Sequence, residues 1–418
     1  MRVLRWEIRK AFLSPSVLGL VFLFMAFNLY LVLNNSVIKE DLKKTSAFAA
    51  AYGTDITGES LDAMKDDYDS LMKQVNLAIE EKESKTYKDM NSFFTDHAFD
   101  PLENYTKEER ELFNDAGLLE YYYSSSLYAD EEYRKIDPVG IAEYNIQKYG
   151  LTGSAAELVR SQYGKFEERF KEVLENGEHM HLFHSQEAFG THLLLFKTMF
   201  KAFLLEGVIL AALITGHVIN FEFDRGTHLL AYSSKRGRRL WQDKFWAALT
   251  SNLVLFTVLL AAGLAVYFAV FPYSQFWQVP MSGYFNKGEH WFMTVREMTF
   301  LQYLAAVIGL SFVMIIIFTL MAALISRWIR NSYLVFFAFL LLFGMIFAVQ
   351  KLFPTSHASY FIGLFTPVNL VLNPFVWFMH RAMHVISGFE LAVSGVWLIF
   401  LAAAVMLSCK SFNRCDLT

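Results

Sequence analysis

Four histidines lie within 14 residues of one another and form the densest group of histidines in the sequence. They are His179, His181, His184 and His192. Imidazole nitrogens bind Zn²⁺ and Cu²⁺, so the cluster raises the question of a metal site. Residues two positions apart, such as His179 and His181, point to different sides of a helix. No cysteine accompanies the four histidines. We expect a polar turn beside the membrane, with a metal site as the alternative.

Glu206 is a carboxylate inside an otherwise apolar segment. Charged groups at membrane depth are costly and usually face a helix bundle or a cavity. Two interpretations remain open. Glu206 pairs with Lys197 or Lys201 near the outer interface, or it contacts a cation or substrate on a transport path. Glu390, near the start of the last apolar segment, has the same two interpretations, with Arg381 as its possible partner.

Nucleotide and hydrolase motifs do not occur in the sequence. The Gly164-Lys165 pair is followed by Phe and lacks a glycine five residues earlier, so it does not form a phosphate-binding loop. HExxH, GxSxG and CxxC are also missing. We therefore expect no enzyme activity and no cofactor bound by this chain.

The composition places these residues in a membrane protein. Of the 418 residues, 54 % are hydrophobic, 17 % are aromatic and only 19 % are charged. Soluble domains contain more charged and fewer apolar residues than this. A helix crosses the hydrocarbon layer with about 20 apolar residues. Six segments approach or exceed that length: 17–33, 202–221, 245–271, 300–326, 332–350 and 391–408.

A further apolar segment, 358–379, is a candidate for a seventh span. Its interior contains Pro367, Asn369, Asn373 and Pro374, which disfavour a continuous helix and free backbone groups that lipid cannot satisfy. We predict a re-entrant or interfacial hairpin, and place these four residues on the candidate transport path. A continuous seventh helix is the alternative.

The distribution of basic residues predicts the orientation, because cytoplasmic segments retain Lys and Arg. One side of the predicted membrane would hold 14 of them, whereas the two short loops on the other side hold four. Both termini are therefore expected in the cytoplasm. The four on the other side are Lys287, Arg296, Lys351 and Arg381.

The positions of the apolar and the charged segments divide the chain into four parts. Residues 1–15 form a predicted cytoplasmic amphipathic elbow helix and 16–36 the first span. Residues 37–196 contain 17 basic residues against 32 acidic ones, a balance of −15, and their helical periodicity predicts an extracellular helical domain. Residues 197–418 contain spans two to six. The predicted fold class is an all-α polytopic membrane protein.

The cytoplasmic segment 221–244 between spans two and three is a basic loop of defined pattern. Lipid headgroup contact would explain its charge. Its residue order also resembles the type-2 ABC transporter permeases, which have a basic elbow helix, six spans and a loop of the form Glu-x-x-x-Gly-Thr followed by Leu-Leu, Ser and basic residues. The matching positions are Glu222, Gly226, Thr227, Leu229, Leu230, Ser233, Ser234, Arg239 and Lys244.

This resemblance implies a permease subunit that dimerises and docks separate ATPase subunits, on which ATP and Mg²⁺ bind. The docking residues would be Glu222, Arg225, Gly226, Thr227, Arg238, Arg239 and Lys244, with Arg327 and Arg330 of the 327–331 turn. The branch with a large outer domain after span one would fit best, in a bacterial plasma membrane. It implies export of an amphiphile, a peptide antibiotic or an ion, with lipids and a second permease subunit as partners and no nucleic acid.

Two other functions remain open from the residues. One is a membrane-anchored sensor or scaffold, whose outer domain binds a ligand and whose inner loops recruit partners. It would need no polar or irregular path through the membrane, which is the feature that Glu206 and segment 358–379 supply. The other is an enzyme embedded in the membrane, for which the outer face lacks a catalytic constellation.

Overall fold

The computed structural model describes residues 2–98, 102–184, 190–234, 237–286, 293–381, 386 and 388–412, the side chains of Arg2, Arg238, Ser411 and Phe412 excepted. Over these residues the chain is all-helical, and its β-type pairing is limited to three isolated bridges. The predicted all-α class is therefore confirmed for the described part of the chain.

Six helices in the described residues are long and apolar enough to cross a membrane, as predicted. This length and composition identify a multi-pass membrane protein. The helices are α2 (Pro15–Asn34), η2 (Leu193–Met199, a π-helix) continued by α10 (Phe200–Asp224), α12 (Leu240–Val270), α13 (Phe300–Trp328), α14 (Ser332–Val349) continued by η4 (Gln350–Leu352), and α16 (Phe389–Phe412).

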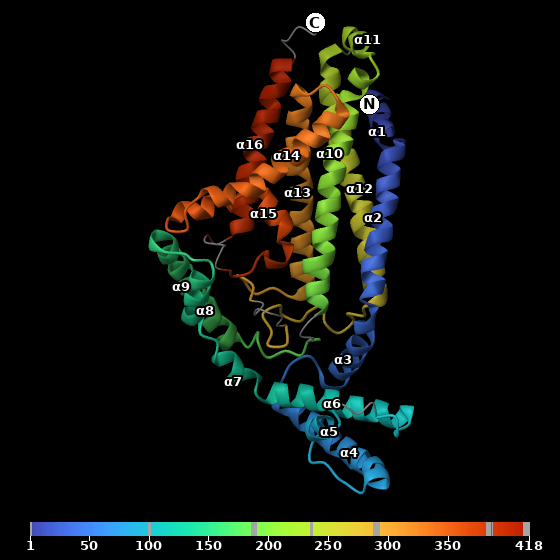
Figure 1. Ribbon diagram of the computed structural model, residues 1–418, viewed down its shortest axis with the longest axis vertical. Coiled ribbons are helices and arrows are strands. Elements are labelled where there is room, and N and C mark those ends of the chain that lie inside the picture. The colour runs from blue at the N-terminus through green and yellow to red at the C-terminus, as the bar shows by residue number, and fades with distance from the viewer. Residues whose placement is uncertain are drawn as a thin grey trace.

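Helix α10 occupies the centre of the bundle. It packs against α12, α13 and α14 and also contacts α1 and α2 (Figure 1). Gly207 permits this close packing, because an added Cβ would lie 2.5 Å from Ile315 Cδ1 and 2.8 Å from Phe256 Cδ2. Small residues play this role where helices approach each other in membranes. Helices α2, α14 and α16 expose most of their apolar surface instead.

A helix also forms before the first span. Two residues separate helix α1 (Arg2–Phe12) from Pro15, which is the first residue of α2. Proline suits that position because its missing N–H has no intrahelical partner there. Helix α1 packs on α12 and α10, and it lies at the same end of the bundle as α11 (His228–Ser233) and η3 (Gly237–Arg239). We call this the α11 end (Figure 1).

The chain between α2 and η2 forms a helical lobe at the opposite end (Figure 1). Amphipathic periodicity explains its longest helices, which bury one stripe and expose the other. Its elements are η1 (Ser36–Ile38), α3 (Lys39–Tyr52), α4 (Gly58–Glu83), α5 (Met90–Asp96), α6 (Lys107–Leu127), α7 (Ala129–Arg134), α8 (Pro138–Lys148) and α9 (Gly153–Asn176).

The lobe has an apolar core of its own and is also attached to the bundle. Phe93 and Phe113 are fully buried between α4, α5 and α6. Toward the bundle, Tyr133 Oη donates to the Ser282 carbonyl at 3.2 Å. The buried Arg169 Nε donates to the Thr294 carbonyl at 3.2 Å. The lobe is therefore held by the loops that join the spans.

Segment 358–379 does not form a seventh continuous helix. It is broken into η5 (Ala358–Ile362), α15 (Pro367–Leu372) and η6 (Pro374–Val376). The two prolines each start a new short element, because proline cannot donate to a preceding helical turn. Helix α15 contacts α10, α13, α14 and α16, so this irregular backbone lies against protein, as backbone at membrane depth must.

Candidate functional site

The turn after α10 has a well-defined cap. The Thr227 amide donates to the Glu222 carbonyl at 2.9 Å, and the Gly226 amide donates to the Phe223 carbonyl at 3.1 Å. These two bonds form a Schellman motif. Gly226 has φ +69°, a left-handed conformation that residues with a Cβ adopt only at a cost. The Glu-x-x-x-Gly-Thr order therefore has a local structural reason: its glycine ends the helix.

The turn between α13 and α14 is attached to the same end of α10. Asn220 Nδ2 donates to the Ile329 carbonyl at 3.0 Å. Ser332 donates twice to the Asp224 carboxylate, from its hydroxyl and from its amide, the latter at 3.3 Å. The Ser332 hydroxyl is also 3.1 Å from the Gly216 carbonyl. The turn between α13 and α14 thus lies against the start of segment 221–244, although the two are more than 100 residues apart in sequence.

Four charged side chains meet where α1, α10 and α12 converge, and we call them the charge quartet: Glu7, Lys10, Glu222 and Lys244. Lys10 Nζ donates to Glu7 and Glu222, both at 2.7 Å. Lys244 Nζ lies 3.2 Å from Glu7, pairs with Glu222 and donates to the Val218 carbonyl at 2.6 Å. Lys244 has 0 % exposed surface, Glu7 has 4 % and Glu222 has 7 %.

The charge quartet is electrically balanced, with two carboxylates and two ammonium groups. Burial opposes the charge of Lys10, but its hydrogen bonds to Glu222 and Glu7 outweigh this effect and hold its pKa above the ordinary value. A balanced buried group resists the loss of any one member, because the others would be left unpaired. The quartet therefore joins α1 to the ends of α10 and α12.

The α11 end also carries large apolar side chains on its surface. Leu229 and Leu230 on α11 are 62 % and 77 % exposed, and Trp328 at the end of α13 is 83 % exposed. Arg330 lies over the Phe223 ring at 5.3 Å. Of the other predicted docking residues, Arg225, Gly226, Thr227 and Arg239 are exposed, Arg327 is half-buried, and the Arg238 side chain, like Lys235 and Arg236, lies outside the described residues.

Glu206 has a different partner from the lysines suggested by its sequence neighbourhood. Its Oε2 accepts a hydrogen bond from Asn28 Nδ2 of α2 at 2.8 Å, and both side chains are buried. Lys197 lies instead against the Phe375 ring at 5.6 Å. The expected pairing with Lys197 or Lys201 is therefore wrong. Glu206 Oε1 has no hydrogen-bond partner, so the carboxylate keeps an acceptor that a cation or a donor could use.

The polar residues of segment 358–379 mostly satisfy one another. Asn369 Nδ2 donates to the Leu364 carbonyl at 3.1 Å, and Asn373 Nδ2 donates to the Asn369 carbonyl at 3.0 Å. Pro367 and Pro374 are buried. These asparagines therefore stabilise a bent backbone against the bundle, and their role on a transport path stays a prediction.

The four histidines do not converge. His179 lies 2.8 Å from Asp130 and His181 lies 3.1 Å from Asp55. His184 and His192 are buried among other groups. Within the part of the chain that the structure describes, no three His, Cys, Asp or Glu side chains are placed to hold a metal ion.

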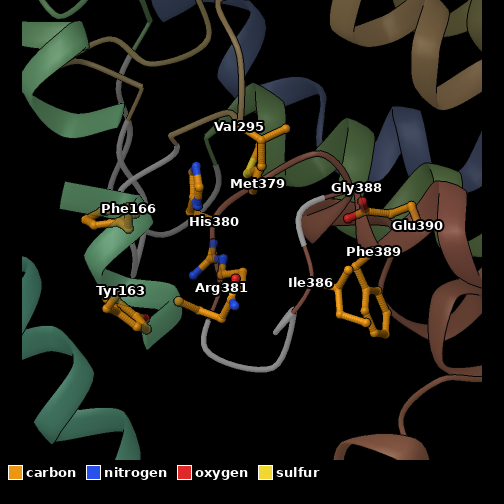
Figure 2. A pocket seen from close by; sticks show the side chains of 11 residues that line it. Tyr163, Phe166, Val295, Met379, His380, Arg381, Ile386, Gly388, Phe389 and Glu390 are labelled. Atoms are coloured by element: carbon orange, nitrogen blue, oxygen red, sulfur yellow. The ribbon is translucent and has the colours of Figure 1, made fainter. Parts of the chain in front are cut away.

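A small cavity separates α9 from the segment that leads into α16 (Figure 2). Tyr163 lies on one side of it and Glu390 on the other, with Arg381 between them. Its volume of about 20 Å³ suits one water molecule. Arg381 Nε and Nη2 have no hydrogen-bond partner, and burial lowers the pKa of this guanidinium. Glu390 Oε1 accepts from the Phe378 amide at 2.9 Å, so these two arginine nitrogens do not form the suggested pair.

Sequence reasoning missed several residues of this site. Glu7 and Lys10 lie in the predicted elbow helix, for which the sequence predicted no ion-pair partners. Asn28 lies in a segment chosen for its lack of charge. Asn252 of α12 donates to Thr215 of α10 at 3.0 Å and to Thr319 of α13 at 2.9 Å. The available signal was the rarity of Asn inside long apolar segments, because a buried amide needs partners on neighbouring helices.

A comparison of this chain with known proteins finds no matching protein family, no matching curated protein and no matching solved structure.

Proposed function

We propose that this chain is the permease subunit of an ATP-driven exporter of the type-2 ABC class. Separate ATPase subunits would dock at the α11 end, and a second permease subunit would complete the translocation unit. The cargo would be an amphiphile, a peptide antibiotic or an ion. ATP and Mg²⁺ would bind to the partner ATPase, and this chain would convert the partner's movement into rearrangement of its helices.

The observation that carries the proposal is the exposed surface of the α11 end, where apolar side chains lie among arginines. Exposed Leu229, Leu230 and Trp328 offer apolar contacts to a partner, with exposed arginines around them. Interfaces commonly combine buried apolar anchors with a charged rim. The ATPase that we propose as the occupant would present an apolar cleft bordered by acidic residues.

The contacts around that surface would transmit force. Helix α11 follows the capped end of α10, the 327–331 turn is hydrogen-bonded to α10, and the charge quartet fixes α1 and α12 to it. Packed elements shift as rigid bodies. A partner that displaces α11 would therefore move α10, which contacts every one of α1, α2, α12, α13 and α14.

The proposed orientation follows from the same end of the molecule. Arg225, Arg239 and Arg330 are exposed there, and α1 contributes Arg5 and Arg9. The positive-inside rule would place this end in the cytoplasm of a bacterial cell and the lobe outside the plasma membrane. Glu206 and the broken segment 358–379 are the polar or irregular features that we place on the candidate transport path.

Co-purification tests this proposal. The chain is expressed with the ATPase reading frames that neighbour its gene, isolated in nanodiscs, and assayed for the ATPase and for ATP hydrolysis. We expect Leu230→Glu to abolish the association, because it places a charge in the apolar centre of the contact. Leu77→Glu on α4 is the matched control, since Leu77 is 68 % exposed but lies in the lobe. Equal ATPase recovery with both variants would contradict the docking surface.

A second function, ligand sensing, is favoured by one observation. The lobe contains a cavity of about 810 Å³ lined by α3, α5 and α6, which is the size of a small-molecule site. A sensor would bind its ligand there without an ATPase. Persistent failure to recover any ATPase, together with ligand binding in the lobe, would favour this second function.

A further inference from the structure

Glu206 lacks the cation that accompanies other buried carboxylates of this chain. Glu7 and Glu222 are paired with the lysines of the charge quartet, and Glu178 is paired with Arg169. Glu206 is equally buried, at 4 % exposed, but its partner within the described residues is the neutral amide of Asn28. A carboxylate that is buried without a cation is strongly destabilised, and such groups are neutralised instead.

The helices around α10 bring no charge to the depth of Glu206. Their titratable side chains lie near the ends of those helices: Tyr30 of α2, Asp243, Lys244 and Tyr267 of α12, Tyr303 and Arg327 of α13, and Tyr333 of α14. The charged groups of α1 and the histidine of α11 lie at the α11 end. On α10 itself, Lys201 is more than one turn away and His217 is three turns away. In the described part of the chain, no charged group acts on Glu206.

Two oxygen atoms of the Asn28–Glu206 pair have no hydrogen-bond partner. Asn28 Nδ2 donates to Glu206 Oε2 at 2.8 Å, which leaves Glu206 Oε1 and Asn28 Oδ1 unpaired, and both atoms are buried. Each of them is attached to the same carbon as one of the two bonded atoms. Both are acceptors when Glu206 is ionised, and buried acceptors without a donor are costly.

Protonation of Glu206 supplies the missing donor for both oxygens. A neutral carboxylic acid carries one O–H and keeps an acceptor. With the proton on Oε1, the acid can donate to Asn28 Oδ1 while Oε2 still accepts from Asn28 Nδ2. If the amide oxygen and nitrogen of Asn28 exchange places, the carbonyl oxygen faces the carboxyl group and a proton is again required.

A metal cation does not suit the same place. Cations such as Ca²⁺ and Mg²⁺ take about six or more oxygen ligands, whereas this pair offers two unpaired oxygens. Both oxygens are buried against protein atoms, and a proton needs no space of its own. No three His, Cys, Asp or Glu side chains among the described residues are placed to hold a metal ion.

We propose that Asn28 and Glu206 form a proton-binding site between α2 and α10, in which Glu206 is a neutral carboxylic acid whose O–H donates to Asn28 Oδ1. When the proton passes to water, the carboxylate and the Asn28 carbonyl oxygen carry charge of the same sign. The contact between the first two spans is then weakened. The proton is thus the ion that joins α2 to α10. Its use in export rests on the proposed function, whereas proton binding itself does not.

Infrared spectroscopy of the full chain in an ester-free detergent tests the proposal. A neutral carboxylic acid has a C=O band that ionised carboxylates and amides lack. The spectrum of Glu206→Gln at about pH 7 is subtracted from that of the parent, and we expect a neutral-acid band in the difference, although an ordinary glutamate is ionised at this pH. Glu143→Gln is the matched control: Glu143 is exposed and paired with Arg160, so its difference should contain carboxylate bands alone.

Asn28→Leu tests the partner of the acid. The neutral-acid band should remain in this variant but move to higher frequency, because the C=O and O–H of Glu206 lose their hydrogen bonds. An unchanged frequency would overturn the role of Asn28. Thermal unfolding reports whether each variant folds. If Glu206→Gln does not fold, Asn28→Leu carries the test, since a neutral-acid band can shift only if Glu206 is neutral.

The pH dependence of stability measures the same proton independently. An unfolded glutamate is ionised at about pH 7, so unfolding would release a proton that the folded chain holds. Stability should therefore fall as the pH rises. Between about pH 5 and 7, the unfolding equilibrium constant of the parent should rise about tenfold more per pH unit than that of Glu206→Gln.

Three outcomes would overturn the proton site. The first is a difference between the parent and Glu206→Gln that contains carboxylate bands alone. The second is an equal pH dependence of the two unfolding constants. The third is a change in the bands of Glu206 when sodium replaces choline in the buffer, which would identify a metal-cation site instead. None of these measurements needs an ATPase, so this proposal and the proposed export function can fail separately.

Discussion

Replacing Lys244 by methionine should strongly destabilise the chain. Lys244 has no exposed surface, and its ammonium contacts Glu7 at 3.2 Å, Glu222, and the Val218 carbonyl at 2.6 Å. Methionine has a similar length but no charge and no donor. The variant would leave two buried carboxylates to share Lys10 as their only cation within the quartet.

The expected size of the effect follows from this imbalance. Removing one partner of a buried ion pair costs about 3–5 kcal/mol, because the remaining charge stays buried without compensation. The whole free energy of unfolding of a protein is only about 5–15 kcal/mol. Adding Glu222→Gln restores the charge balance. The double variant should therefore recover at least about 1 kcal/mol relative to the sum of the two single changes.

The double-mutant cycle compares the parent, Lys244→Met, Glu222→Gln and the double variant. Equilibrium unfolding in detergent, followed by tryptophan fluorescence, measures the free energy of unfolding of each. Arg160→Met is the control, because Arg160 and Glu143 form an ion pair at 2.6 Å in which both side chains are about half-exposed. Exposed pairs contribute little, so this control should unfold like the parent. A Lys244→Met variant with parental stability, or additive effects in the cycle, would show that the quartet does not hold α1, α10 and α12 together.

Three further predictions concern other parts of the chain. Burial lowers the pKa of His184 to about 4, so between about pH 6.5 and 4 the unfolded chain binds a proton that the folded chain does not. As the pH falls through this range, the free energy of unfolding should therefore fall by up to about 3 kcal/mol. Thermal unfolding should show a smaller pH effect for His184→Asn, and an equal effect would refute this cause. Gly207→Ala should cost about 1–3 kcal/mol in chemical unfolding, because its Cβ would lie 2.5 Å from Ile315, whereas Gly309→Ala, with no atom within 4 Å, should cost nothing. Gly226→Ala should destabilise the chain by about 1 kcal/mol because of its φ of +69°; an unchanged melting curve would argue against the Schellman turn.

The spans and the break in segment 358–379 could be predicted because each depends on local sequence. An apolar segment of membrane length has few other places to fold. Pro367 and Pro374 interrupt a helix wherever they occur, and both start new elements in the structure. The helical periodicity of residues 37–196 likewise predicted helices in this part of the chain, where α4 and α9 form.

The partners of buried polar groups could not be predicted, because they come from distant parts of the chain. Glu206 was matched with lysines on its own helix, whereas Asn28 reaches it across 178 residues. Glu7 and Lys244 are 237 residues apart. Hydropathy identifies which helices are buried in a membrane but gives no information about which faces meet. The lobe cavity also arises only from the packing of α3, α5 and α6 with His184.

Photocrosslinking in living cells tests the proposed docking surface most directly. A benzoylphenylalanine is placed at Leu230, which is 77 % exposed at the α11 end, and at Leu77, which is 68 % exposed in the lobe. We expect that the Leu230 position crosslinks to an ATPase with a phosphate-binding loop and that the Leu77 position does not. Crosslinks from Leu230 to lipid alone, or an ATPase captured from Leu77, would contradict it.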